Sequence, residues 1–375
     1  MYRMSESSSL VRKRPQCLQP NLFVGMSKSI IPPHSGHCWS NRFELELSGA
    51  HLNSCYGRAN NGRASATRYI RRSGDRKRGT LAKLLLPGPA SEDLGKSIAT
   101  KLGLDLLKSE FKVFPDEESK FTSEGKVAGE NVFIVQSTYP PVDQHLFQLL
   151  LASHQLSQEG ARVTAVVPYL AYARQDKQFL PGEAVTLGVV AHLMRSAGVR
   201  RLVTVDIHSA EGLSFFSFPA YSVSAVPRLA GYAKENLGLS ETIVISPDFG
   251  ASKRTEAFAA LYGAKYVQLS KTRDKETGEV KVKEELVDVK GKDVMIVDDI
   301  ISTGGTLKAA AETVLSQGAN QVVAICTHLL FAGDALNKLE KSGVKRIIGT
   351  NTVPGKFSVV DVSDALASHL RTLEE

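Results

Sequence analysis

The chain has 375 residues, of which 42% are hydrophobic, and this is enough for about two to three domains with their own cores. These values exclude a wholly disordered or fibrous protein. No apolar run reaches the roughly 18–20 uncharged residues that a membrane-spanning helix needs, so we expect no membrane partner.

The net charge of +7 is unevenly distributed along the chain. Residues 1–79 hold 14 Lys and Arg against 4 Asp and Glu, whereas the remaining residues hold 32 against 35. The basic charge therefore belongs to an N-terminal leader, and the rest of the chain offers no general attraction for polyanions. A nucleic-acid-binding function would depend on the leader alone, and we expect no nucleic-acid partner.

Residues 1–79 show no sustained strand or helix periodicity and are rich in Ser, Asn, Gly and Arg, which predicts a disordered basic leader. Its few acidic residues are typical of a transit peptide, which would direct the protein to a plastid or mitochondrion. The unpatterned Trp39, Cys and His residues slightly favour the alternative that this segment is translated upstream sequence. Because Cys326 is the one Cys after residue 79, we expect no disulfide there and a reducing, cytoplasmic location.

From Leu81 onward, short apolar segments alternate with longer amphipathic ones. Strands are predicted over residues 83–86, 131–136, 162–167, 201–205, 242–245, 265–269, 294–297, 321–325 and 345–349. Helices are predicted over residues 143–158, 183–197, 226–236, 252–261, 306–317 and 333–342. This alternation predicts an α/β fold of parallel sheets covered by helices, in which ligands bind at the carboxyl ends of the strands.

Two polar segments lie in the first part of this pattern. Residues 114–118 (FPDEE) form a predicted turn whose composition is more typical of an acidic surface than of a site. Residues 168–181 follow a predicted strand and carry Arg174 among Tyr169, Tyr172 and Phe179. Such a group suits a nucleotide, because Arg pairs with phosphate and aromatic rings stack on the base. Taken alone, a solvated basic turn is the better interpretation of this segment.

Two predicted strands end in a candidate metal ligand. Residues 206–209 (DIHS) place His208 after the strand over residues 201–205. A lone His is usually structural, but beside an Asp at a strand end it becomes a candidate ligand. Asp248 repeats this placement after the strand over residues 242–245. A carboxylate oxygen suits magnesium better than an imidazole does.

Residues 270–279 (SKTRDKETGE) predict a mobile polar hairpin with Gly278 at its tip. Lys271 and Arg273, separated by one residue, could close over a polyphosphate. A solvated charge run is the commoner meaning of such a string, so both interpretations stay open.

The strongest local signal is the segment over residues 296–306 (IVDDIISTGGT), where a buried strand delivers Asp298 and Asp299 to the sheet edge. The following turn presents backbone N–H groups and hydroxyls at a helix N-terminus, and its glycines allow close approach, which predicts a phosphate site. Because carboxylates repel phosphate, we expect Asp298 and Asp299 to hold sugar hydroxyls or a magnesium ion nearby. The alternative is an ordinary turn capped by Thr303, which leaves both carboxylates and both glycines unexplained.

Two segments of the chain also resemble each other. Residues 201–209 (RLVTVDIHS) and 293–303 (DVMIVDDIIST) are both apolar strands that end in Val-Asp and open into a polar loop. We therefore expect two similar domains, over residues 80–221 and 222–375, joined near residues 218–224, where Pro219 interrupts the pattern.

The segment over residues 296–306 is similar to the phosphoribosyl-diphosphate motif of the type I phosphoribosyltransferase fold. Residues 81–373 resemble the ribose-phosphate pyrophosphokinase family, which is built on two copies of that fold. The resemblance implies transfer of the β,γ-diphosphoryl group of ATP to the anomeric hydroxyl of ribose 5-phosphate. The products are 5-phospho-α-D-ribose 1-diphosphate, which supplies nucleotide biosynthesis, and AMP, and the implied cofactor is Mg²⁺.

The resemblance also implies a homo-oligomer that shares its ATP site between subunits, and the aromatic residues Phe215, Phe216 and Phe218 favour such an assembly. Two alternative functions have the same fold. A type I phosphoribosyltransferase would need only one such domain and no Arg174 segment. A non-catalytic regulatory subunit is disfavoured because Lys271 and Arg273 are both retained.

The resemblance assigns roles to matching residues. It nominates Lys271 and Arg273 as the catalytic pair, and His208 and Asp248 as metal contacts. The residues that it nominates for ATP, the first three from a neighbouring subunit, are Phe114, Asp116, Glu118, Arg174, Gln175, Asp176 and His208. Those that it nominates for ribose 5-phosphate are Asp298, Asp299, Ser302, Thr303, Gly304, Gly305 and Thr306. Ser302 departs from the acid that many family members carry there, although its hydroxyl can still donate to phosphate.

Overall fold

The computed structural model describes residues 84–248, 250–269, 271–273, 280–282 and 288–373. Within these ranges it contains two six-stranded sheets, in which every strand pairs in parallel, and two antiparallel hairpins. This arrangement confirms the predicted α/β fold of two similar parallel sheets. The predicted leader, residues 1–79, lies outside the described residues.

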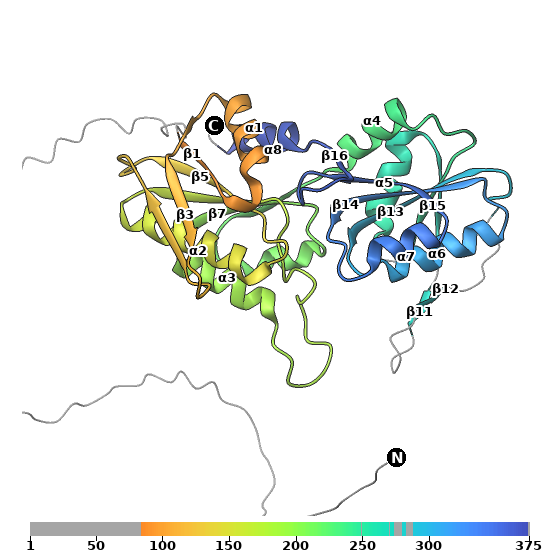
Figure 1. Ribbon diagram of the computed structural model, residues 1–375, viewed down its shortest axis with the longest axis horizontal. Helices are drawn as coiled ribbons and strands as arrows, with labels where there is room; N and C mark the ends of the chain where they lie inside the picture. The colour runs from red at the N-terminus through yellow and green to blue at the C-terminus, as the bar shows by residue number, and fades with distance from the viewer. Residues whose placement is uncertain (1–83, 249, 270, 274–279, 283–287, 374–375) are drawn as a thin grey trace, which may run out of the picture. The chain divides into compact units, whose positions relative to one another are not determined.

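The first half, residues 84–223, is built on a sheet with the strand order β2-β1-β5-β6-β7-β8. Its central strands are apolar throughout because both sheet faces are covered; in β5, every residue after Asn131 is buried. The strands are β1 (Leu84–Pro87), β2 (Asp105–Leu106), β5 (Asn131–Val135), β6 (Arg162–Val167), β7 (Val199–Val205) and β8 (Ala220–Val223). The helices of this half are α1 (Glu92–Leu102), α2 (Val142–Gln158) and α3 (Thr186–Ser196), with the 3₁₀ helices η1 (Pro89–Ser91) and η2 (Ala210–Phe215) (Figure 1).

The second half, residues 243–360, repeats this plan with the strand order β10-β9-β13-β14-β15-β16. Its strands are β9 (Ile243–Ser246), β10 (Lys265–Gln268), β13 (Asp293–Ile301), β14 (Gln321–Leu329), β15 (Val344–Thr350) and β16 (Ser358–Val360). Its helices are α5 (Ser252–Tyr262), α6 (Gly305–Ser316) and α7 (Ala335–Lys341). Every strand and helix predicted from the sequence overlaps an observed one, whereas α1, a C-terminal helix and seven short strands are not in the predicted set. Two of these seven strands form the hairpin that was predicted near residues 270–279.

The observed repeat pairs different segments from those that the sequence suggested. Because β5 and β13 are each third in their sheet, β13 corresponds to β5, while β7 corresponds to β15. The similarity between residues 201–209 and 293–303 therefore does not reflect equivalent positions. Both segments look alike because a buried strand that opens into a polar loop imposes the same pattern anywhere in such a sheet.

The loop after β5 differs from its counterpart after β13. Gln136 and Ser137 stand where the second half carries Asp298 and Asp299. Gln136 Oε1 accepts a hydrogen bond from the Ala90 backbone N–H at 3.0 Å, and Ser137 Oγ donates to the Thr352 carbonyl at 2.6 Å. The first half therefore uses this loop for contacts within the fold, including one to the second half.

Two helices cross between the halves (Figure 1). Helix α4 (Val226–Asn236) follows the first sheet but packs against α5, and α8 (Ser363–Thr372) follows the second sheet but packs against α1. Leu366 and Leu370 of α8 belong to the same apolar cluster as Leu94 and Ile98 of α1. The expected boundary between residues 221 and 222 falls inside β8, and α8 covers the first sheet rather than its own.

The two hairpins extend from the sheets. The first pairs β3 (Ser109–Val113) with β4 (Ser119–Ser123), and the tilted rings of Phe111 and Phe121 contact each other with centroids 4.7 Å apart. The second pairs β11 (Lys271–Arg273) with β12 (Val280–Val282). Each hairpin carries one predicted functional segment.

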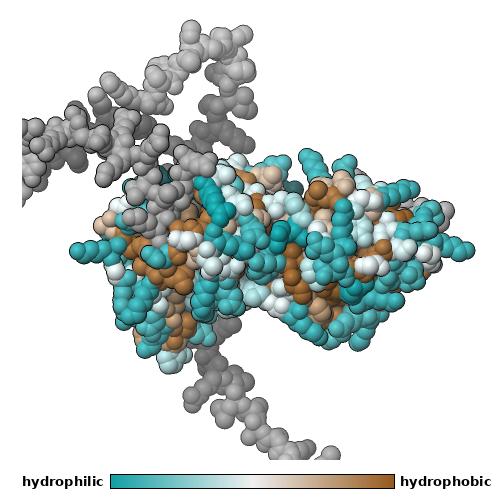
Figure 2. Space-filling model, turned by 90° about the horizontal axis from the view of Figure 1, so that it is seen from above, coloured by the Kyte–Doolittle hydropathy of each residue, from teal (hydrophilic) through white to brown (hydrophobic). Residues whose placement is uncertain are grey.

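In the described ranges, no helix is both long enough and apolar enough to cross a membrane. In Figure 2, hydrophilic residues cover much of the visible face and hydrophobic patches lie between them. Of the predicted aromatic cluster, Phe216 and Phe218 are buried in the first half and Phe215 is 39% exposed. Two of these three aromatics therefore serve the core rather than an interface.

Candidate functional site

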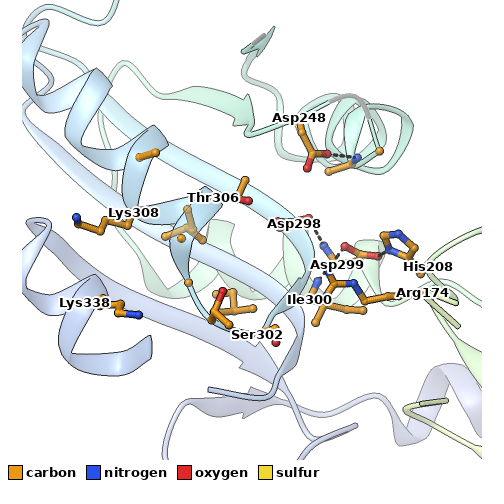
Figure 3. A pocket seen from close by; sticks show the side chains of 18 of the residues that line it. Arg174, His208, Asp248, Asp298, Asp299, Ile300, Ser302, Thr306, Lys308 and Lys338 are labelled. Carbon is orange, nitrogen blue, oxygen red and sulfur yellow. Dashed lines mark hydrogen bonds and ion pairs between the residues drawn. The ribbon is translucent and has the colours of Figure 1, made fainter. Parts of the chain in front are cut away.

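A cavity of about 640 Å³ opens at the carboxyl end of β13 (Figure 3). Residues 298–309 form much of its wall, and Asp248 lines it from the loop after β9. Arg174 and His208 line it from the first half. The structure thus brings together the predicted phosphate loop, both candidate metal ligands and two predicted ATP residues, Arg174 and His208, of which His208 is also a candidate metal ligand.

The wall that suits phosphate is the turn from β13 into α6. Gly304 is the N-cap of α6 with φ 74°, a left-handed conformation that favours glycine, and no side chain caps the helix. The alternative of a turn capped by Thr303 is therefore wrong. Thr303 and Gly305 are exposed, while Ser302 and Thr306 are half-buried. A helix N-terminus without a side-chain cap presents its first N–H groups to an anion.

Asp298 and Asp299 are buried at the inner end of this wall, with exposed fractions of 9% and 6%. Asp298 Oδ1 accepts the Asp299 backbone N–H at 2.9 Å, and Asp299 Oδ1 accepts the Ile300 N–H at 3.0 Å. Burial raises the pKa of Asp298 well above its usual range, and the negative charges of Asp299 and Asp248 raise it further. The backbone N–H of Asp299 favours the ionised form of Asp298, but burial and the two neighbouring negative charges outweigh it.

Asp299 has the opposite environment. Its Oδ2 accepts a hydrogen bond from His208 Nδ1 at 2.7 Å and lies 3.5 Å from Arg254 Nη1. Burial acts to raise the pKa of Asp299, but the His208 hydrogen bond and the Arg254 charge outweigh it and bring the pKa below its ordinary value. The two adjacent acids, predicted to share one role, thus differ in their partners.

Asp248 lines the same cavity as Asp298 and Asp299, from the loop after the neighbouring strand β9. Its Oδ1 accepts the Ala251 backbone N–H at 3.1 Å, which fixes the carboxylate at the start of α5. In the described ranges, no three His, Cys, Asp or Glu side chains gather closely enough to hold a metal by protein ligands alone. Mg²⁺ does not require such a cage, because it keeps several waters and takes one or two carboxylates together with substrate phosphates. The carboxylates of Asp248 and Asp298 fit that donor set.

The remaining predicted ATP residues do not line the cavity. Gln175 Oε1 accepts a hydrogen bond from the Thr186 hydroxyl at 2.6 Å, and Asp176 follows Gln175 in the same loop. Phe114, Asp116 and Glu118 lie in the turn between β3 and β4, where Lys112 Nζ lies 4.8 Å from the centre of the Phe114 ring. The backbone of Lys271 and Arg273 lies in β11, and their side chains lie outside the described residues.

Sequence reasoning missed three cations near this site. Lys308 and Lys338 line the cavity from α6 and α7, and Arg254 of α5 pairs with the buried Asp206 and Asp299. Lys308 could have been found, because it follows the phosphate turn within the first turn of the predicted helix. Arg254 and Lys338 lie in ordinary charged helix segments whose sequence carries no such signal.

Comparisons with known proteins agree with this geometry. Residues 83–198 match the family model for the N-terminal domain of ribose phosphate pyrophosphokinase, and residues 245–373 match that for the phosphoribosyl synthetase-associated domain. A ribose-phosphate pyrophosphokinase of Sulfurisphaera tokodaii is 38% identical over 289 residues, which are 76% of this chain and 99% of that protein. One from Aquifex aeolicus is 35% identical over 298 residues, covering 78% and 96%.

A solved structure extends the likeness to the fold. The crystal structure of phosphoribosylpyrophosphate synthetase from Mycobacterium smegmatis has a TM-score of 0.70 and 30% identity, and the match covers 78% of this chain and 98% of that one. The repeated sheets, the loop over residues 298–306 and these matches lead to one conclusion: the chain belongs to the ribose-phosphate pyrophosphokinase family.

Proposed function

We propose that this chain transfers the β,γ-diphosphoryl group of ATP to the anomeric hydroxyl of ribose 5-phosphate. The observation that carries the proposal is one cavity in which a glycine-containing helix N-terminus and adjacent buried carboxylates meet Arg174 and His208 of the other half. Phosphate and sugar hydroxyls need these groups at opposite ends of a small site.

The sugar phosphate occupies the second half in this proposal. Residues 302–306 bind the 5-phosphate through backbone N–H groups and hydroxyls, and Asp298 and Asp299 accept hydrogen bonds from the ribose hydroxyls. The support is the position of both carboxyls on the cavity wall, at the start of the turn that leads into α6.

The nucleotide lies toward the first half. Arg174 and His208 face its phosphates, Gln175 and Asp176 continue that surface, and Phe114, Asp116 and Glu118 come from a second copy of the chain. The support is the position of Arg174 and His208 on the cavity wall opposite the phosphate turn. Mg²⁺ would be held by Asp248 and His208, with Asp298 nearby, and would neutralise charge on the phosphate oxygens.

The chemistry is an in-line displacement at the β-phosphorus. The anomeric oxygen forms the new P–O bond, the bond to the α-phosphate oxygen breaks, AMP leaves, and the proton of the anomeric hydroxyl is released. Such a transfer depends on positioning and charge stabilisation rather than on a protein nucleophile. Lys271 and Arg273 stabilise the charge on the moving group and on AMP.

Product analysis with ATP labelled at the γ-phosphate tests this proposal. With ribose 5-phosphate and Mg²⁺ present, we expect the label in the sugar diphosphate and AMP in equal amount. A phosphoribosyltransferase would instead consume the sugar diphosphate with a nucleobase, and a regulatory subunit would yield neither product. Label released as inorganic phosphate, or no AMP, contradicts the proposed reaction.

We also propose a homo-oligomer, because α2, α3 and η2 expose four large apolar residues on neighbouring elements. Phe147, Val189, Leu193 and Phe215 are 52%, 51%, 41% and 39% exposed. Leu193→Glu should therefore lower the mass measured by light scattering to that of a single chain and weaken ATP binding. Leu261→Glu is the matched control, since Leu261 is 47% exposed on α5. An unchanged mass for Leu193→Glu counts against this interface.

Gly304→Ala should weaken ribose 5-phosphate binding more than ATP binding. An Ala at φ 74° is strained by about 1–2 kcal/mol, and its Cβ would lie 3.3 Å from Leu339 Cγ, so the phosphate turn must shift. Calorimetric titration of each ligand measures the effect. Gly305→Ala is the control for stability, because its Cβ would meet nothing within 4 Å. Equal weakening of both ligands by Gly304→Ala would show that the turn does not serve the sugar phosphate alone.

We further propose a cytoplasmic location, since the free, buried Cys326 thiol suits a reducing compartment. Mass measurement on protein from its own cells tests this. A chain shortened near residue 79 in an organelle fraction would contradict it and favour a transit peptide.

A further inference from the structure

Arg254 occupies a junction between the two halves. It lies in the first turn of α5, and only 15% of its side chain is exposed. Its Nη2 donates to the Ile207 carbonyl at 3.2 Å, and its Nε lies 3.7 Å from Asp206 Oδ1. Its Nη1 lies 3.5 Å from Asp299 Oδ2. One guanidinium thus contacts the end of β7 in the first half and the end of β13 in the second.

The Asp299 oxygen that faces Arg254 is the one that holds His208. His208 Nδ1 lies 2.7 Å from Asp299 Oδ2, as the dashed line in Figure 3 marks. An ionised carboxylate only accepts hydrogen bonds, so Nδ1 is the donor and the hydrogen bond sets the direction of Nε2. The other Asp299 oxygen is held by the Ile300 N–H. The carboxylate therefore has little freedom while Arg254 is in place.

Arg254 is one of several groups that hold the backbone before His208. Asp206 has φ 38°, a left-handed conformation that is strained for a non-glycine residue. Its Oδ2 accepts the Ala225 N–H at 3.1 Å and Thr327 Oγ1 at 2.7 Å, so contacts to β14 and to the start of α4 hold it. Those other contacts remain when Arg254 is removed, whereas the contact of Arg254 with the His208 ring itself passes through Asp299.

We infer that Arg254 is a positioning residue that acts through Asp299 on His208. The carboxylate beside the sugar-phosphate loop thereby fixes the orientation of an imidazole on the opposite half. Asp299 thus has a role in addition to the proposed ribose contact. Arg254 connects the proposed sugar-phosphate site in the second half with His208 in the first half. The kinetic part of this inference rests on the proposed function, whereas the ring orientation does not.

A double-mutant cycle in the full chain tests the link. Arg254→Ala should lower kcat/KM by about 10- to 100-fold, which is the usual loss when a residue behind a functional group is removed. If Arg254 acts through His208, the same change in a His208→Ala background should add less than about threefold. Arg254→Lys, which can still reach one acceptor, should recover part of the loss. If the double variant instead lost kcat/KM by the product of the two single losses, the two residues would act independently and the inference would be overturned.

Two control variants separate positioning from stability. Lys253→Ala removes an exposed cation from the neighbouring position of the same helix, and it should leave kinetics unchanged. Thr327→Val removes the hydroxyl that holds Asp206 and should lower the melting temperature with little kinetic effect. An Arg254→Ala variant that behaves like Thr327→Val, less stable but kinetically normal, would show that Arg254 is only structural.

Nitrogen NMR of the His208 ring gives a readout that needs no turnover. At mildly alkaline pH the parent should show the tautomer protonated at Nδ1, assigned by its absence from His208→Ala. Arg254→Ala should mix the two tautomers. A parent that makes no AMP would refute the proposed reaction, but the ring measurement would still decide this inference. An unchanged tautomer in Arg254→Ala would overturn it.

Discussion

Replacing Lys271 or Arg273 by Ala should lower kcat by about 10²- to 10⁴-fold, with much smaller changes in the Michaelis constants. Charge builds up on the transferred diphosphoryl group and on AMP in the transition state, so a cation aimed there acts mainly on kcat. Strand β11 carries both residues, and its partner β12 packs beside α6, the helix that begins at the phosphate turn. The hairpin therefore lies beside the helix that begins at the phosphate turn.

Steady-state kinetics with each substrate varied in turn measures this effect. Lys281→Ala is a matched control, because Lys281 lies in the same hairpin but pairs with Thr272 rather than with either candidate. If both candidate variants kept kcat within about threefold of the parent, the hairpin would be a solvated charge run. Arg174 and Lys177 would then be the next cations to test.

Ending the chain after Val360 should abolish cooperative folding or lower the melting temperature drastically. Helix α8 would be lost, and with it Val362, Leu366 and Leu370, which are at most 1% exposed. Each fully buried Val or Leu stabilises by roughly 1.5–3 kcal/mol, while a whole protein has only about 5–15 kcal/mol. The loss would also uncover Leu94 and Ile98 of α1 in the first half.

Thermal unfolding followed by circular dichroism checks this expectation. Asp364→Asn is the control, because it removes the ion pairs to Lys101 at 2.6 Å and to Arg228 at 3.3 Å but keeps the apolar face of α8. Such half-exposed pairs contribute at most about 1 kcal/mol. A shortened chain that melted like the parent would show that the first sheet is stable without the helix that it receives from the second half.

The sequence predicted those elements whose pattern is local. The segment over residues 296–306 could be read because a strand, two acids and a glycine turn stand together, and the structure gathers them at one cavity. Helix α1 was missed because Gly95 lies in its first turn. The packing explains this glycine, because a Cβ at position 95 would lie 2.7 Å from the Pro87 Cβ and leave no room for a side chain.

The rest depends on contacts that are distant in the sequence. Residues 218–224 looked like a linker because Pro219 precedes a strand of four residues, β8, that is at most half-buried. Arg254 could not be found because nothing in its helix indicates that Asp299, 45 positions later, shares its environment. For the same reason, the sequence could not show that the neighbouring residues Asp298 and Asp299 have different partners.

The loop after β5 has a consequence for stoichiometry. At the position where β13 presents two acids, Gln136 binds the Ala90 N–H and Ser137 binds the Thr352 carbonyl. The second half thus presents acids at this position, whereas the first half uses the equivalent position for contacts within the fold. Equilibrium titration should accordingly saturate at one sugar phosphate per polypeptide, even though the scaffold occurs twice.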